Sequence, residues 1–326
     1  MEVTGTATPV AGVTAFLSVY EDGVLHSILG PDLPGFITAP LTPDPDVEGH
    51  SLNFTLPIDL EEGSDVDLVV NIDPLNSIAE TDEGNNTGSL NDLVFECRET
   101  PEIVYTAINY TAAAEPDPST LGLPDPDLIA AGNGDDFVFG IYPFPDDRSQ
   151  YHAGPFPPLN WNQDVDTSYT DLLNFLEDCR QVINPVPKFL YGWFRENPFF
   201  GNGVAISAPG NVGFGNTQTS PDRYQRTFAH ELGHLFGLFH NSRDLAPDTG
   251  WDVENLLGLG KVMPGTKFDI MRGGLLTPEA WVDDITYEFF LDSECIDCTG
   301  DTGDFISEAP WVTLAFPRFG GETILN

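Results

Sequence analysis

The chain has 326 residues, of which 52 are acidic and 12 are basic, so its formal net charge is −40 at neutral pH. This charge argues against nucleic-acid binding and against anionic membranes, because both need a basic protein surface. The acidic excess has two interpretations, a strongly solvated surface or carboxylates that bind Ca2+, and no loop matches the EF-hand pattern.

The sequence pattern of residues 1–98 predicts an all-β domain. Residues 65–73 alternate apolar and polar side chains, as expected for a half-buried strand. The apolar side of that strand is formed by Val66, Leu68, Val70 and Ile72. Further short strands are expected at residues 14–20, 51–56 and 90–95. Several short strands separated by turns are typical of a β-sandwich.

The stretch from Val69 to Thr87 includes a Glu-x-Asp-Glu-x-Asn-Asn run at residues 80–86. This stretch resembles the CARDB family, whose members are immunoglobulin-like domains of bacterial surface and secreted proteins. The resemblance covers about the first 98 residues and implies an immunoglobulin-like sandwich that acts as a spacer or adhesive module. The alternative is an ordinary turn, because segments rich in Asp, Asn and Gly commonly form turns.

The sequence pattern of residues 99–299 predicts an α+β domain. Residues 166–183 form the clearest amphipathic helix, which the Asn184-Pro185 pair ends. Residues 222–238 predict a second helix. Strands are expected at residues 102–110, 137–142, 188–194 and 204–207. Residues 300–326 open with an acidic linker, and their apolar run is either a strand that docks back or the start of a further domain.

The second of these helices carries His230, Glu231 and His234, with Gly237 near its end and His240 just beyond it. His230 and His234 are one turn apart and project from the same helix face, so two imidazoles can hold one Zn2+. Glu231 is close enough to accept a proton from a water that the metal activates. Gly237 can adopt a positive φ and end the helix in a sharp turn, which would bring His240 back as a third ligand. Three protein ligands leave one position open, as in catalytic zinc sites.

This long motif, with Gly237 and His240 both in register, resembles the signature of the metzincin zinc metalloproteases. In that family a methionine turn forms a floor beneath the zinc ligands. Asp269-Ile270-Met271 resembles that turn, and Met263 is the competing methionine. Gly273 stands where some metzincins have a tyrosine that assists the zinc site, so no tyrosine is assigned to catalysis.

Residues 277–290 follow the expected methionine turn and predict a helix, with Thr277 as its cap and Pro278 in its first turn. The segment resembles the C-terminal helix of secreted bacterial metzincins. Upstream, Val204, Ala205 and Ile206 lie in an expected edge strand that could pair with an extended substrate, although these residues could equally be core.

The two resemblances together imply an α+β metzincin-like catalytic domain, with a mixed sheet and a zinc-binding helix, behind an N-terminal immunoglobulin-like sandwich. They imply a secreted or cell-surface zinc endopeptidase that cleaves proteins or glycoproteins, with Glu231 as general base. The alternative is a surface adhesion protein whose metalloprotease fold is not its main activity. Residues 1–5 lack the features of a signal peptide, so the chain is either cytosolic or a mature segment.

The four cysteines are Cys97, Cys179, Cys295 and Cys298. An even number suits disulfides in an exported protein, with three possible pairings. Cys295 and Cys298 have the spacing of a metal-binding pair, but no second pair of ligands stands near them in the sequence. Cys179 lies on the apolar face of a predicted helix and suits simple burial. No apolar run approaches the roughly 20 residues needed to cross a bilayer, so membrane insertion is not expected.

Overall fold

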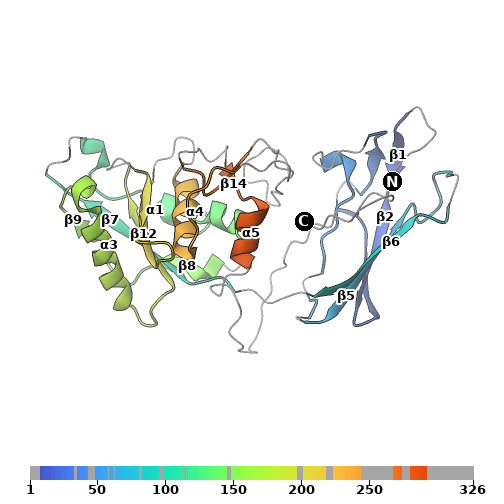
Figure 1. The fold of residues 1–326 in the computed structure, drawn as a ribbon, viewed down its shortest axis with the longest axis horizontal. Coiled ribbons are helices and arrows are strands. Elements are labelled where there is room, and N and C mark those ends of the chain that lie inside the picture. The colour runs from blue at the N-terminus through green and yellow to red at the C-terminus, as the bar shows by residue number, and fades with distance from the viewer. Residues whose placement is uncertain are drawn as a thin grey trace. The chain divides into compact units, whose positions relative to one another are not determined.

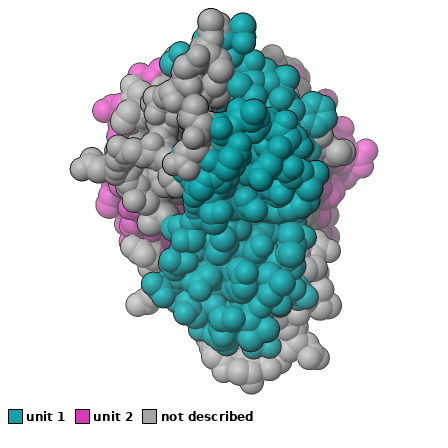
Figure 2. Space-filling view, turned by 90° about the vertical axis from the view of Figure 1, so that its right-hand side faces the viewer, with its two compact units in different colours: residues 1–97, 300–326 teal, residues 98–299 magenta. Residues whose placement is uncertain are grey.

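The computed structural model describes residues 8–32, 35–42, 48–57, 59–61, 63–80, 83–94, 99–113, 115, 117–144, 148–196, 201–217, 223–243, 267–273 and 280–291. The chain divides into two compact units, Met1–Cys97 with Gly300–Asn326, and Arg98–Thr299. Figure 2 colours the two units separately. The division lies one residue before the boundary expected from the sequence, and the expectation for residues 300–326 lies outside the described residues.

The described part of the first unit is built from strands and one short 3-10 turn. Its main sheet is antiparallel, in the order β3-β2-β5-β6 (Figure 1). These strands are β2 (Ala15–Glu21), β3 (Val24–Leu29), β5 (Asp65–Ile72) and β6 (Thr87–Val94). A separate pair is formed by β1 (Val10–Val13) and β4 (Ile37–Ala39), and the turn is η1 (Glu48–His50).

One face of this antiparallel sheet makes the core of the first unit. Leu17, Leu68 and Val70 are buried there, in the alternation that the sequence predicts. The expected strand at 51–56 is wrong, because these residues form no ladder. Phe54 and Leu56 are still buried in the same core. The alternation of apolar residues at 51–56 therefore indicates burial, although the segment pairs with no strand.

The second unit has a six-stranded mixed sheet, in the order β11-β12-β10-β7-β8, with β9 also paired to β7. All neighbouring pairs are parallel except β11 with β12, so β11 is an antiparallel edge strand. The strands are β7 (Ile103–Tyr110), β8 (Tyr151–Ala153), β9 (Leu159–Trp161), β10 (Phe189–Phe194), β11 (Gly203–Ala205) and β12 (Val212–Asn216).

Helices cover both faces of this sheet (Figure 1). The central strand β10 sends Phe189, Tyr191 and Trp193 to one face and Leu190 and Phe194 to the other, as the two-residue period of a strand requires. The first face packs against α4 (Arg223–Phe236) and α2 (Asp136–Ile141), and the second packs against α3 (Val165–Gln181). The shorter segments are α1 (Pro126–Ile129), η2 (Pro118–Thr120) and η3 (Arg148–Gln150).

The expected strand at residues 137–142 is wrong, because this segment forms the helix α2 and its C-cap. Phe137, Val138, Phe139 and Ile141 are all buried, so the helix has no polar face to reveal its period. Such a short apolar run does not distinguish a buried helix from a buried strand.

The predicted C-terminal helix starts later than residue 277. Ala280 and Trp281 form strand β14, which pairs in parallel with β13 (Phe268–Asp269), and the helix α5 spans Asp284–Leu291. Asp283 caps α5, because its carboxylate accepts a hydrogen bond from the main-chain N–H of Thr286 at 2.7 Å. None of the helices in the described part of the chain has the length and apolar character needed to cross a membrane.

Candidate metal centre

The helix α4 ends where the sequence requires a turn. Gly237 follows its last residue with a φ of 118°, a conformation that glycine adopts most readily. Its N–H donates to the carbonyl of His234 at 2.9 Å, and the N–H of Leu238 donates to the carbonyl of Gly233 at 3.0 Å. This pair of bonds is the Schellman arrangement, which reverses the chain after α4. The reversal brings His240 back to the two helical histidines.

The three histidines of the motif meet at their Nε2 atoms. The Nε2 atom of His240 lies 2.9 Å from that of His230 and 3.2 Å from that of His234. The three potential ligand atoms lie within 4.8 Å of one another. Nitrogens bound tetrahedrally to zinc at about 2.0–2.1 Å would be about 3.3–3.4 Å apart, so small shifts would fit the ion.

The outer nitrogens of two of these rings are held by main-chain carbonyls. The Nδ1 atom of His230 lies 2.8 Å from the carbonyl oxygen of Ile270, and that of His234 lies 2.7 Å from the carbonyl oxygen of Leu238. A carbonyl only accepts, so both Nδ1 atoms carry the proton and both Nε2 atoms present a bare lone pair to the centre. Burial lowers the pKa of both rings, which keeps them neutral as metal binding requires.

Glu231 is buried beside the histidines, against the edge strand β11. A Cβ added to Gly203 would lie 2.6 Å from Cγ of Glu231, so a glycine at that position leaves room for the carboxyl group. Burial raises the pKa of Glu231 to about 8, opposed by the nearby charge of Arg226 and by a hydrogen bond from the N–H of Ala205. The side chain is therefore a buried carboxyl group that can take up and release a proton near neutral pH.

The strand expected at residues 204–207 is found as the edge strand β11, which spans Gly203–Ala205. Ile206 donates its N–H to the carbonyl of Val212 at 2.9 Å, so the main chain of Ala205 points away from β12 and toward Glu231. The side chains of Val204 and Ile206 pack against the core beside α3. This agrees with the alternative that these residues belong to the core. Ile206 lies just beyond the end of β11.

The methionine of the expected turn lies directly beneath the motif helix. Met271 is fully buried, and a Cβ added to Gly233 would lie 2.4 Å from its sulfur. Gly233 therefore allows the thioether to pack against the helix backbone between the two helical histidines. The competing Met263 lies outside the described residues.

A buried polar network holds the turn and the segment after His240. The carboxylate of Asp269 accepts hydrogen bonds from the side chain of Asn241 at 2.5 Å and from the N–H of Met271 at 2.9 Å. The other oxygen of Asp269 accepts from the N–H of Asp283 at 3.1 Å. Arg243 donates to both carboxylate oxygens of Asp283. Although burial acts in the opposite direction, these hydrogen bonds lower the pKa of Asp283.

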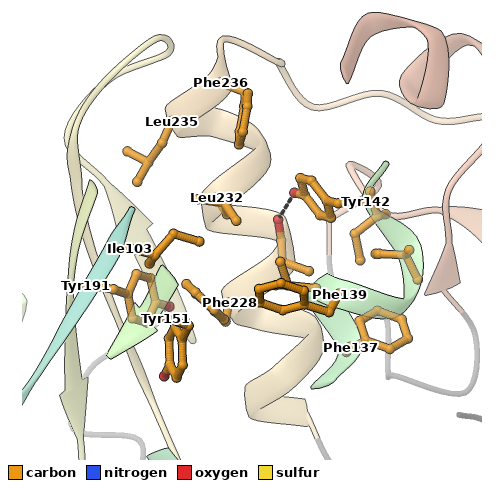
Figure 3. Close-up of a cluster of buried hydrophobic side chains, with 14 of the residues drawn as sticks. Ile103, Phe137, Phe139, Tyr142, Tyr151, Tyr191, Phe228, Leu232, Leu235 and Phe236 are labelled. Carbon is orange, nitrogen blue, oxygen red and sulfur yellow. Dashed lines mark hydrogen bonds between the residues drawn. The ribbon is translucent and has the colours of Figure 1, made fainter. Parts of the chain in front are cut away.

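Two buried residues at the centre were not found by the sequence analysis. Tyr142, at the end of α2, donates its hydroxyl to the carbonyl of Ala229 at 2.5 Å, as the dashed line in Figure 3 shows. Arg226 donates to the carbonyls of Ile270 and Arg272. Arg226 precedes His230 by four residues, so its place on the same helix face was a signal available in the sequence.

Some other residues of the second unit, and the acidic residues of the first, add no ligand to this centre. Gly273 is exposed, and Tyr287 lies on α5 with its pKa raised by burial. Calcium is not supported: among the described residues Asp65, Asp67 and Asp92 come together in the first unit, but exposed acidic groups of this kind are common without an ion. Cys179 is a free thiol, and the other three cysteines lie outside the described residues.

The mixed α+β fold and the three-histidine donor set are compatible with a metallopeptidase. A family model described as the reprolysin-like metallopeptidases of family M12B matches residues 199–265. That short region includes β11, β12, α4 and all three histidines. The match supports a zinc metalloendopeptidase, and the mixed α+β architecture is compatible with a metzincin-like domain. A comparison with curated proteins gave no match.

Proposed function

We propose that this protein is a secreted zinc-dependent endopeptidase of the metzincin type, with His230, His234 and His240 as its zinc ligands. One observation carries the proposal. Two of these histidines present bare Nε2 lone pairs toward the third, because main-chain carbonyls occupy their Nδ1 atoms. A neutral His240 has one N–H and could satisfy only one of these two lone pairs well, whereas a metal ion accepts lone pairs from all three rings.

The chain's own residues supply the remaining functions. Glu231 would accept a proton from the attacking water and later deliver it to the leaving amine. The N–H of Ala205, on the outward side of β11, donates to that carboxylate, so an extended peptide that pairs with β11 would have to take over this donor. Met271 would support the ligands from below without touching substrate. Bound zinc would polarise the scissile carbonyl and lower the pKa of water toward about 7.

The wider organisation is also part of the proposal. Residues 1–98 would be a CARDB-like immunoglobulin-fold module, residues 99–299 the protease domain, and residues 300–326 a linker with a strand or the start of a further domain. The antiparallel sheet and its single apolar core support a separate first module. A module of this kind would place the protease on a surface or in the extracellular medium, where it would cleave proteins or glycoproteins.

The direct test is hydrolysis of casein and of a mucin by the full chain. We expect cleavage by the zinc-loaded protein, loss of cleavage after removal of the metal with a chelator, and recovery when zinc is returned. Cleavage that persists in the metal-free protein would contradict the proposal. Zinc-loaded protein that stays folded and cleaves no casein, mucin or unstructured peptide would also contradict it, in favour of an adhesive function.

A further inference from the structure

Arg226 is a buried cation that the proposed chemistry leaves without a function. It lies on α4 one turn before His230 and on the same face of the helix. Only 5% of its surface is exposed. Its Nε atom has no hydrogen-bond partner in the described part of the chain. A buried and incompletely paired guanidinium costs stability, so packing alone does not explain an arginine at this position.

The guanidinium of Arg226 spans the methionine turn. Its Nη2 atom donates to the carbonyl of Ile270 at 2.9 Å and also donates to the carbonyl of Arg272. These two carbonyls flank Met271. One side chain of the motif helix therefore fixes the main chain on both sides of the methionine.

The carbonyl of Ile270 is shared with a candidate zinc ligand. It accepts the hydrogen bond from Arg226 and also the 2.8 Å hydrogen bond from Nδ1 of His230. A carbonyl oxygen has two lone pairs and can accept both. The position of this oxygen sets the tautomer and the ring orientation of His230, and Arg226 holds the oxygen in place.

We propose that Arg226 is a positioning residue of the metal centre, which acts on His230 through the shared carbonyl of Ile270. The inference rests on the proposed zinc-peptidase function. It assigns to Arg226 an effect on metal affinity rather than on substrate, because the side chain is buried and its hydrogen bonds go to the methionine turn. Burial lowers the pKa of Arg226 to about 10, so the guanidinium keeps its charge at neutral pH.

Arg180 provides a matched control in the same unit. It is also buried, with 8% of its surface exposed, and its Nη1 atom donates to the carbonyl of Pro187 at 2.7 Å. It lies on α3, whose apolar residues pack on the opposite face of the sheet from α4. Loss of Arg180 removes a comparable buried guanidinium and leaves the carbonyl of Ile270 untouched.

The experiment measures zinc affinity of the folded full chain by competition with a chromophoric chelator. Outer partners of metal-bound histidines typically change metal affinity by about 10–100-fold. We expect Arg226→Met to weaken zinc binding by about that factor. Arg180→Met should leave the zinc dissociation constant at the wild-type value, although it lowers the melting temperature. Arg226→Lys keeps the charge, but its shorter side chain does not place a donor where Nη2 bonds both carbonyls, so it should give an intermediate affinity.

A second readout follows the ring that Arg226 is inferred to position. The chain has only six histidines, so 1H–15N correlation spectra of the zinc-loaded protein can resolve their tautomers. We expect the Nδ1–H signal of His230 to shift and to exchange faster with water in Arg226→Met and Arg226→Lys, but not in Arg180→Met. A purely structural arginine would lower stability and leave this signal unchanged.

The outcomes separate this inference from the proposed function. If the wild-type chain takes up no zinc, the proposed function and the inference both fall. If the wild type binds zinc and cleaves peptides, but folded Arg226→Met has the wild-type dissociation constant, only the inference falls. Should Arg226→Met fail to fold, Arg226→Lys decides, and wild-type affinity with an unchanged His230 signal would overturn the inference.

Discussion

The two faces of the central sheet in the second unit differ in what they bury. The core on the face covered by α3 is mostly aliphatic, with Leu172, Leu173 and Leu176 fully or nearly fully buried, although it also contains aromatic residues such as Tyr110 and Phe214. The face covered by α4 is rich in aromatic side chains such as Phe137, Tyr191 and Phe228 (Figure 3). The helix α4 itself also buries Arg226, His230 and Glu231. The shared strand β10 contributes to the aromatic character of the α4 face, but the buried ionisable groups Arg226, His230 and Glu231 all come from α4.

Buried charges destabilise a fold unless they are well paired, and perturbed ionisable groups concentrate at functional sites. The carboxyl groups on the two sides show the contrast. On α3, hydrogen bonds from Arg180 lower the pKa of Glu177. On α4, burial raises the pKa of Glu231 to about 8. One face of the sheet stabilises the unit, and the other carries the candidate chemistry at some cost in stability.

The largest expected effect comes from Glu231→Gln, which keeps the shape of the side chain and removes the base. General-base catalysis contributes about 10²–10⁴-fold, so peptide hydrolysis should fall by at least about that factor while zinc is retained. Activity and zinc content of the purified variant check this. The matched control is Glu177→Gln on α3, which should leave hydrolysis unchanged.

Either of two results would break this part of the comparison. Near wild-type hydrolysis by Glu231→Gln would rule out Glu231 as the base. Loss of zinc together with activity would instead make Glu231 a ligand or a structural residue.

Leu176→Ala tests the other face. Leu176 is fully buried against β10, and large-to-small changes in a core cost about 2–5 kcal/mol in the free energy of unfolding. Denaturant unfolding of the full chain should show this loss, while the zinc affinity of the folded protein stays unchanged. A variant that remains folded but binds zinc much more weakly would show that the two faces are coupled.

Gly233→Ala should have a smaller effect, confined to the functional face. The added Cβ would lie 2.4 Å from the sulfur of Met271 and 3.3 Å from the hydroxyl oxygen of Tyr142. Overpacking of this kind typically costs about 1–3 kcal/mol in the free energy of unfolding. Gly273→Ala, two residues after Met271, is the control, because its added Cβ would meet nothing within 4 Å. Equal stability of the two variants would mean that Met271 does not pack tightly against the helix.

The smallest effect concerns the pH dependence of stability on the α3 face. The pKa of Glu177 is lowered from its ordinary value of 4.5, first by a hydrogen bond from Arg180. The unfolded chain therefore binds more protons than the folded chain at acid pH, so this contribution is present above about pH 4.5 and is lost as the pH falls below it. Glu177→Gln should be slightly less stable than wild type at pH 7, with the difference shrinking toward pH 3. If the stability difference between Glu177→Gln and wild type grew on acidification, the pKa of Glu177 would be raised in the folded chain rather than lowered.

Strongly periodic or motif-bearing segments were predictable from the sequence. The helix at 166–183 and the helix at 222–238 correspond to α3 and α4, and the alternation at 65–73 corresponds to β5. The histidine spacing gave the donors of the candidate centre, because one helical turn and one glycine turn determine where the three rings meet.

Features that depend on tertiary packing were not predictable. Strand β12 contains Gly213 and Gly215, which disfavour a strand on local grounds. In the structure a Cβ on Gly215 would lie 2.3 Å from the hydroxyl oxygen of Tyr191, so the neighbouring strand requires a small residue there. Tyr142 reaches the carbonyl of Ala229 across 87 residues of sequence, a contact that no local pattern encodes.

The coordination shell of bound zinc tests the central claim most directly. X-ray absorption spectra of the zinc-loaded full chain should fit three imidazole nitrogens and one further light atom at about 2.0–2.1 Å, with no sulfur. The same spectrum of His240→Ala should lose one imidazole. A shell that needs sulfur at about 2.3 Å would assign the zinc to cysteines such as Cys295 and Cys298, and would contradict the three-histidine centre.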